Sequence, residues 1–224
     1  MSAAAFELDH VVVFSAVDAP ERAHLEALGL RGFGGVTRHG ELGSASTAFF
    51  FVADYLELLW AHDDAAAQAN FGPLGLDLVA RREWRRSRAS PFGIMLRRRA
   101  GASAAFPFST RRLAATWMPG DVHVQFAGDD PAEPYSGLLP AELAFPSFRA
   151  NIPDLEHPLG LRRLTKVHMA TTADRCSPLA EWLAGAGIAE MTPGPEPLLT
   201  LTFDEGAQGR TVDARPVLPI VLEL

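Results

Sequence analysis

The amino-acid sequence predicts an α+β fold built from units of one strand, one helix and three further strands. The amino-terminal part of the chain carries patterns for these five elements in that order, and the carboxy-terminal part repeats the start of the same pattern. A repeat at a constant spacing indicates a duplicated structural unit. In this chain His10, Pro20 and Gly29 recur 158 positions later as His168, Pro178 and Gly187.

The first predicted unit spans residues 6–62 and opens with a strand at 8–14. Alternate side chains of a strand point to opposite faces. Val11 and Val13 therefore share one face, which is purely apolar, and His10 lies on the other face. A histidine in an apolar strand is either a satisfied core residue or a functional group, and the pattern alone allows both.

A helix is predicted over residues 20–28. Asp18 followed by Glu21 has the spacing of a capping box, in which two side chains satisfy free backbone N–H groups at a helix start. Proline is favoured in the first turn of a helix, and glycine is a common residue just after its end. Gly29 therefore marks the end of this helix.

Three strands complete the first unit, at residues 31–38, 46–52 and 55–60. The last of them contains Glu57 among five apolar residues. Burial of a lone carboxylate costs several kcal/mol unless it is paired, protonated or bound to a metal. Glu57 is therefore a candidate functional residue.

The last predicted unit spans residues 163–224. His168 lies in its first strand, 164–170, and Ser177 caps the helix 178–186. Three strands follow, at 198–203, 210–214 and 217–224, and the last of these carries a lone carboxylate, Glu223.

The middle region, residues 63–162, has weaker patterns and is either a degenerate unit or an insertion. It begins with a helical turn at 65–70 and a basic amphipathic helix at 76–88. Short strands are predicted at 92–98, 111–117, 122–126 and 143–149.

Two histidines and two carboxylates on strands are predicted to meet at a divalent-metal site. The proposed ligands are His10, Glu57, His168 and Glu223. Zn, Ni, Mn, Fe and Co are all compatible with such ligands. A carboxylate that leaves the metal could act as the proton-transferring base. Glu223 is the first choice for that catalytic role and Glu57 the second.

The runs at 8–13 and 55–60, with a helix and a hairpin between them, resemble the glyoxalase, bleomycin-resistance and extradiol-dioxygenase (vicinal oxygen chelate) superfamily, in particular glyoxalase-like members with a long middle region. The resemblance implies paired βαβββ modules that form curved mixed sheets around a cleft. It also implies metal ligands on the first and last strands of each module, which map onto His10, Glu57, His168 and Glu223.

The resemblance leaves the reaction open, because one fold hosts many chemistries. It implies a metal-dependent lyase, isomerase or dioxygenase that acts on a small oxygen-rich substrate, or a metal-free protein that binds or sequesters a small molecule. A homodimer is compatible with it, since related enzymes build each site between two subunits. In the metal-free interpretation the cleft is lined by aromatic residues such as Phe14, Phe51, Tyr55, Trp60 and Trp117.

Composition excludes several other classes. The net charge of −7 disfavours a nucleic-acid partner. No apolar stretch approaches the roughly 20 residues of a membrane span. Cys176 is the only cysteine, which fits a reducing compartment. With no signal-peptide pattern at the amino terminus, a cytoplasmic location is expected.

The densest positive segment, residues 81–99, has two interpretations. Its arginines could bind an anionic ligand or a partner protein, or they could form a solvated basic surface balanced by nearby acidic residues. The arginines are Arg81, Arg82, Arg85, Arg86, Arg88, Arg97, Arg98 and Arg99.

Overall fold

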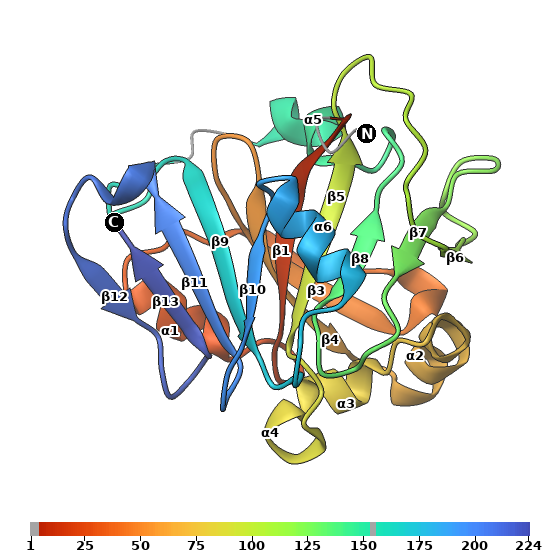
Figure 1. The fold of residues 1–224 in the computed structure, drawn as a ribbon, viewed down its shortest axis with the longest axis horizontal. Helices are drawn as coiled ribbons and strands as arrows, with labels where there is room; N and C mark the ends of the chain where they lie inside the picture. Colours follow the sequence, from red (N-terminus) through yellow and green to blue (C-terminus); the bar gives the residue numbers. More distant parts are fainter. Residues whose placement is uncertain (1–4, 153–155) are drawn as a thin grey trace.

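The computed structural model describes residues 5–152 and 156–224. Residues 1–4, which belong to the segment used to predict the absence of a signal peptide, and residues 153–155 of the middle region lie outside the described part. The chain forms two mixed sheets (Figure 1). The larger has eight strands in the order β2-β3-β4-β1-β5-β8-β7-β6, and the smaller has five in the order β10-β9-β11-β13-β12. The predicted α+β class with curved mixed sheets is confirmed.

The first unit has the predicted order of elements. Its first and last strands, β1 and β4, lie next to each other and run parallel, with His10 opposite Tyr55. This pairing places the histidine strand against the glutamate strand, as expected. The elements are β1 (Phe6–Phe14), α1 (Glu21–Ala27), β2 (Phe33–Arg38), β3 (Ser44–Phe50) and β4 (Tyr55–Ala61).

The predicted capping box at α1 is wrong. The helix is preceded by Pro20 and has no side-chain cap. Asp18 has a φ of 63°, and the Glu21 carboxylate accepts a hydrogen bond from the backbone N–H of Ala16 at 3.1 Å. The loop before the helix therefore uses Glu21 to close its own turn. The predicted helix end is correct, since Gly29 has a φ of 100°.

The middle region completes the large sheet. β5 pairs antiparallel with β1 and parallel with β8, so the order β5-β8-β7-β6 reproduces the strand order of the first unit. Residues 99–110 replace the helix of that unit. The middle region therefore adds four strands to the large sheet, and they are β5 (Phe92–Arg98), β6 (Arg111–Leu113), β7 (Val124–Ala127) and β8 (Tyr135–Leu138).

Several predictions for the middle region need correction. The helix expected over 76–88 is interrupted at Glu83, which has non-helical angles of −95° and 31°. The strand expected at 143–149 is helical, with Pro146 in its first turn, and β8 was not predicted. The α-helices are α2 (Asp64–Phe71), α3 (Leu78–Arg82), α4 (Trp84–Ser87) and α5 (Phe145–Phe148), and the 3-10 turns of the chain are Gly40–Leu42, Gly72–Leu74, Arg149–Asn151 and Asp204–Gly206.

The last unit begins as predicted and then departs from the first. The Ser177 hydroxyl caps α6 by accepting the N–H of Ala180 at 3.2 Å. β13, however, pairs with β11 and β12, and β11 separates it from β9. The elements are β9 (Leu164–Thr171), α6 (Pro178–Gly185), β10 (Glu190–Pro193), β11 (Leu198–Phe203), β12 (Thr211–Asp213) and β13 (Ile220–Glu223).

One apolar core joins the two sheets and the helices α1 and α6 (Figure 1). Val11 and Val13 of β1 and Leu58 of β4 point into it, together with Val167 and Leu201 of the small sheet. The side chains that alternate with these on β1 and β4 point to the opposite face of the large sheet. A second apolar cluster, with Val12 and Phe14, covers that face. Within the described residues, no helix is long and apolar enough to cross a membrane.

A glycine between β3 and the preceding turn provides a first prediction. Gly43 has a φ of 72°, and a Cβ there would lie 2.6 Å from the backbone N of Ala67. Gly34 has a φ of 65° but open space around it. Gly34→Ala is therefore expected to lower the free energy of unfolding only by the conformational cost of a positive φ, about 1 kcal/mol. Gly43→Ala is expected to lower it by about 2 kcal/mol or more. Urea denaturation of both variants checks this, and equal losses would contradict the proposed backbone clash.

Candidate ligand-binding cleft

A cleft of about 610 Å³ lies on the face of the large sheet that points away from the shared core. Most side chains around it are aromatic, aliphatic or thioether groups, contributed by both halves of the sheet and by the segments around α2, α3 and α5. Pockets of this size and composition are typical of small-molecule sites. The apolar lining includes Phe14, Phe50, Tyr55, Leu59, Phe71, Met95, Trp117, Met118, Phe126, Tyr135 and Phe148.

The polar side chains His10, His39, Ser44, Ser46 and Glu57 line one part of this cleft, which we call its polar end. His10 is 4% exposed. Its Nδ1 is 2.8 Å from Oδ1 of Asp9, and its Nε2 is 3.5 Å from Oε2 of Glu57. The ring stacks on Tyr55 with a centroid separation of 4.1 Å. The structure therefore brings together two of the four predicted ligands, one from each of the paired strands β1 and β4.

Asp9 is fully buried behind His10 because the register of β1 against β5 shifts between Leu8 and His10. One Asp9 oxygen contacts His10, and the other accepts hydrogen bonds from the N–H of Phe145 at 2.8 Å and from Arg97 at 3.3 Å. This second oxygen fixes α5 at the edge of the cleft. Four charged groups, Arg97, Asp9, His10 and Glu57, therefore alternate in sign from the protein interior to the cleft.

The charges of this array follow from its contacts. Burial alone would lower the pKa of His10, but the hydrogen bonds and charges of Asp9 and Glu57 raise it to about 9. Burial would raise the pKa of Glu57, but the hydrogen bond and charge of His10 outweigh this effect and lower it. At neutral pH the cleft therefore holds an imidazolium cation between two carboxylates.

A second histidine, His39, lies among the polar side chains of the cleft and was not one of the predicted ligands. Its Nδ1 is 2.9 Å from the hydroxyl of Ser44 and its Nε2 is 3.4 Å from that of Ser46. Burial lowers the pKa of His39, so the ring is neutral at pH 7. The signal that could have revealed this region is the alternation of small residues Ser44, Ser46 and Ala48 on β3, the strand next to Glu57.

The other two predicted ligands, His168 and Glu223, do not reach the cleft. His168 Nε2 is 3.0 Å from the Thr192 hydroxyl, and the Glu223 carboxylate accepts a hydrogen bond from Thr202 at 2.7 Å. Both lie on the outer face of the small sheet, because their neighbours Met169 and Leu222 fill the shared core.

The expectation that the four ligands meet is therefore wrong, and so is the placement of Glu223 as a base in the cleft. Across residues 5–152 and 156–224, no three His, Cys, Asp or Glu side chains are arranged to hold a metal ion. The four residues therefore do not form a single donor set. His10 and Glu57 are the members that line the cleft.

The predicted aromatic lining is correct for Phe14, Tyr55 and Trp117. Phe51 and Trp60 instead lie in the core between the sheets. Trp60 alternates with Leu59 along β4, and therefore points to the opposite face.

Most of the arginine cluster is engaged in internal contacts. Arg81 is buried and donates hydrogen bonds to the carbonyls of Ser90 and Glu133 at 2.8 and 3.0 Å. Arg82 pairs with Asp64 at 2.9 Å. Such contacts agree with the interpretation of a basic segment balanced by neighbouring acceptors.

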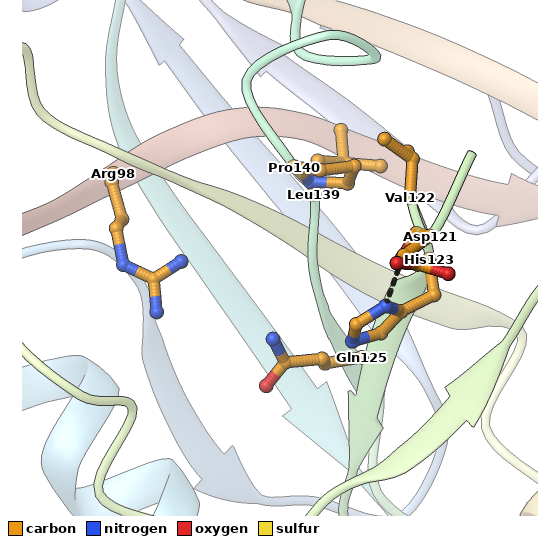
Figure 2. A pocket seen from close by; sticks show the side chains of 7 residues that line it. All are labelled: Arg98, Asp121, Val122, His123, Gln125, Leu139 and Pro140. Carbon is orange, nitrogen blue, oxygen red and sulfur yellow. Dashed lines mark hydrogen bonds between the residues drawn. The ribbon is translucent and has the colours of Figure 1, made fainter. Parts of the chain in front are cut away.

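His123 and Gln125 line a separate hollow of about 300 Å³, together with Arg98. Figure 2 shows these side chains around the hollow and the hydrogen bond of 2.9 Å between His123 Nδ1 and the Asp121 carbonyl. Gln125 pairs across the sheet with Leu138, which belongs to the shared core. The hollow is therefore on the opposite side of the large sheet from the cleft.

No protein-family model matches the chain, and no match is found among curated protein sequences. A solved structure of a hypothetical protein from Staphylococcus aureus is similar over 97% of this chain and 98% of its own, with a TM-score of 0.56 and 12% sequence identity. The chain therefore shares its overall fold with that protein. The similarity carries no information about activity.

Proposed function

We propose that the chain binds a small, largely apolar molecule in the cleft and that the His10–Glu57 pair holds a polar group of that molecule. The observation that carries the proposal is the cleft itself, about 610 Å³ of mainly apolar lining with buried charged groups at one end. Apolar walls supply affinity, and a few precisely held polar groups supply orientation.

The polar end is preorganised for this role. Asp9 holds the His10 ring from behind, and Tyr55 stacks against it. Rigid support of this kind reduces the entropy lost when a ligand binds.

Thermal shift with 2-naphthol, a neutral two-ring probe, tests the proposal. Saturating probe is expected to raise the melting temperature by about 5 °C. Ala48→Phe, which places a ring in the cleft, is expected to abolish the shift. Val36→Phe, on the exposed strand β2, is the matched control and should retain it. If Ala48→Phe and Val36→Phe both retain the shift in melting temperature, binding in the cleft is contradicted.

A metal-dependent enzyme of the glyoxalase-like type, acting as a lyase, isomerase or dioxygenase, is the second candidate. One observation favours it: the carboxylate of Asp9 contacts the ring of His10. Metal-bound histidines usually have a carboxylate in this position, which orients the ring.

Elemental analysis of protein purified without chelators distinguishes the two candidates. About one equivalent of Zn, Ni, Mn or Fe in the wild type, lost in His10→Ala and Glu57→Ala, would support the enzyme. A metal content unchanged in both variants would argue that any bound ion lies elsewhere.

A further inference from the structure

The cleft has a strong imbalance in its charged and polar groups. Glu57 and Glu142 both line it, whereas none of its described lining residues is lysine or arginine. Arg97 lies behind Asp9 and is engaged by Asp9 and Glu7. An anionic ligand would therefore meet two carboxylates in the lining, and the imidazolium of His10, the cation there, is already held between Asp9 and Glu57.

At the His10–Glu57 pair, the hydrogen-bonding capacity left for a ligand is that of an acceptor, while the hydroxyls of Thr37, Tyr55 and Tyr135 elsewhere in the lining can donate. The two nitrogens of His10 are already directed at Asp9 and Glu57. The two nitrogens of His39 are directed at Ser44 and Ser46. An ionised carboxylate has about four acceptor positions and no donor.

Glu57 keeps part of this acceptor capacity for a ligand. Its side chain is 14% exposed and lines the cleft. Its contacts with His10 and Ser46 leave further lone pairs free. A ligand group that donates a hydrogen bond is therefore satisfied at Glu57, whereas a group that only accepts is not.

The walls near Glu57 favour an aromatic or cationic ligand. Tyr55, Phe50 and Phe148 pack within 5.0 to 6.3 Å of one another, measured between ring centroids. Aromatic faces stack on ligand rings and attract ammonium groups.

We infer that the ligand class is a ring-bearing alcohol or amine, whose hydroxyl or amino group donates a hydrogen bond to Glu57, and that carboxylic acids with the same ring are rejected. This inference rests on the proposed function and names the chemistry of its ligand. When a carboxylic acid binds, the Glu57 carboxylate receives no hydrogen bond from the ligand. The loss of this hydrogen bond provides the specificity.

Calorimetric titration with three probes on one frame tests the inference at pH 7: 2-naphthol, 2-naphthylmethylamine and 2-naphthoate. The alcohol and the amine are expected to bind at least about tenfold more tightly than the acid, because a lost charge-assisted hydrogen bond costs this much or more. A naphthoate affinity equal to or above that of the other probes would overturn the inference.

Three variants separate a direct contact with Glu57 from general electrostatics. Glu57→Gln is expected to reduce amine affinity by about tenfold and to strengthen naphthoate binding. Glu142→Gln, which removes the other carboxylate of the lining, should change each affinity less than about threefold. Ser46→Ala provides a second variant at the same end and should retain the donor preference.

The results also separate this inference from the proposed function. Equal binding of all three probes would keep the cleft as a binding site and overturn the donor preference. An unchanged preference in a folded Glu57→Gln protein would likewise overturn the assignment to Glu57. Binding of none of the probes would overturn the proposed function and this inference with it.

Discussion

Arg97→Met is expected to lower the free energy of unfolding by about 3–5 kcal/mol at pH 7. The guanidinium donates to Glu7 at 2.7 Å, to Asp9 at 3.3 Å and to the carbonyl of Ala53 at 3.0 Å. Its side chain is 9% exposed, and Asp9 is fully buried. Methionine fills much of the space but removes one of the two cations that contact the buried Asp9 carboxylate, leaving only His10, and removal of one partner from a buried ion pair is strongly destabilising.

Urea denaturation of the wild type and the variant measures this loss. Arg99→Met is the matched control, because Arg99 also pairs with Glu7 at 2.8 Å but is 54% exposed. An exposed pair contributes at most about 1 kcal/mol. Similar losses in the two variants would show that the contact with Asp9 has no special weight, and would contradict the buried array of charges.

Asp54→Asn is expected to stabilise the protein by about 2 kcal/mol at pH 8. Asp54 is 6% exposed, and its Oδ1 has no hydrogen-bond partner among the described residues. Burial raises its pKa from 3.8 to about 7, despite the opposing charge of Arg97. The folded state therefore disfavours the ionised form.

The sign of the pH dependence follows from linkage. Because the folded pKa is the higher one, Asp54 destabilises the wild type progressively as pH rises from about 4 to about 7, and fully above that range. The advantage of Asn is thus largest at pH 8 and should vanish near pH 4. Denaturation at both pH values measures it, and a constant difference would contradict the raised pKa.

Asp213→Asn is the control for the opposite sign. Contact with Arg215 lowers the pKa of this exposed carboxylate to about 2. Removal of this carboxylate is expected to lower the free energy of unfolding by no more than about 0.5 kcal/mol, because solvent screens the pair.

The local elements of the first unit could be predicted from the sequence because they depend on alternation. The two-residue period of β1 and β4 assigns His10 and Glu57 to one face of the sheet and Val11 and Leu58 to the other, and the structure confirms this division. The parallel pairing of β1 with β4 then brings His10 and Glu57 together. The pairing of β1 with β4 was predicted only from the resemblance to a superfamily, because no local pattern in the sequence indicates which strands are neighbours.

The long-range pairings could not be predicted. His10 and His168 each lie on a strand that is followed by a helix, but local sequence does not determine which strand β13 pairs with. It joins β11 instead of β9, and so Glu223 is separated from His168. The large sheet is likewise completed by the middle region, whose strands have weak patterns. His39 was missed because its site depends on the fold of the turn before β3.

Methyl NMR of methionines tests the central claim most directly, because the chain contains both probes and internal controls. Met95 and Met118 line the cleft, whereas Met169 and Met191 belong to the core shared by the two sheets. With ¹³C-methyl methionine and increasing 2-naphthol, the signals of Met95 and Met118 are predicted to shift together and saturably, while those of Met169 and Met191 stay in place. Shifts of Met169 and Met191 without shifts of Met95 and Met118 would contradict the cleft as the binding site.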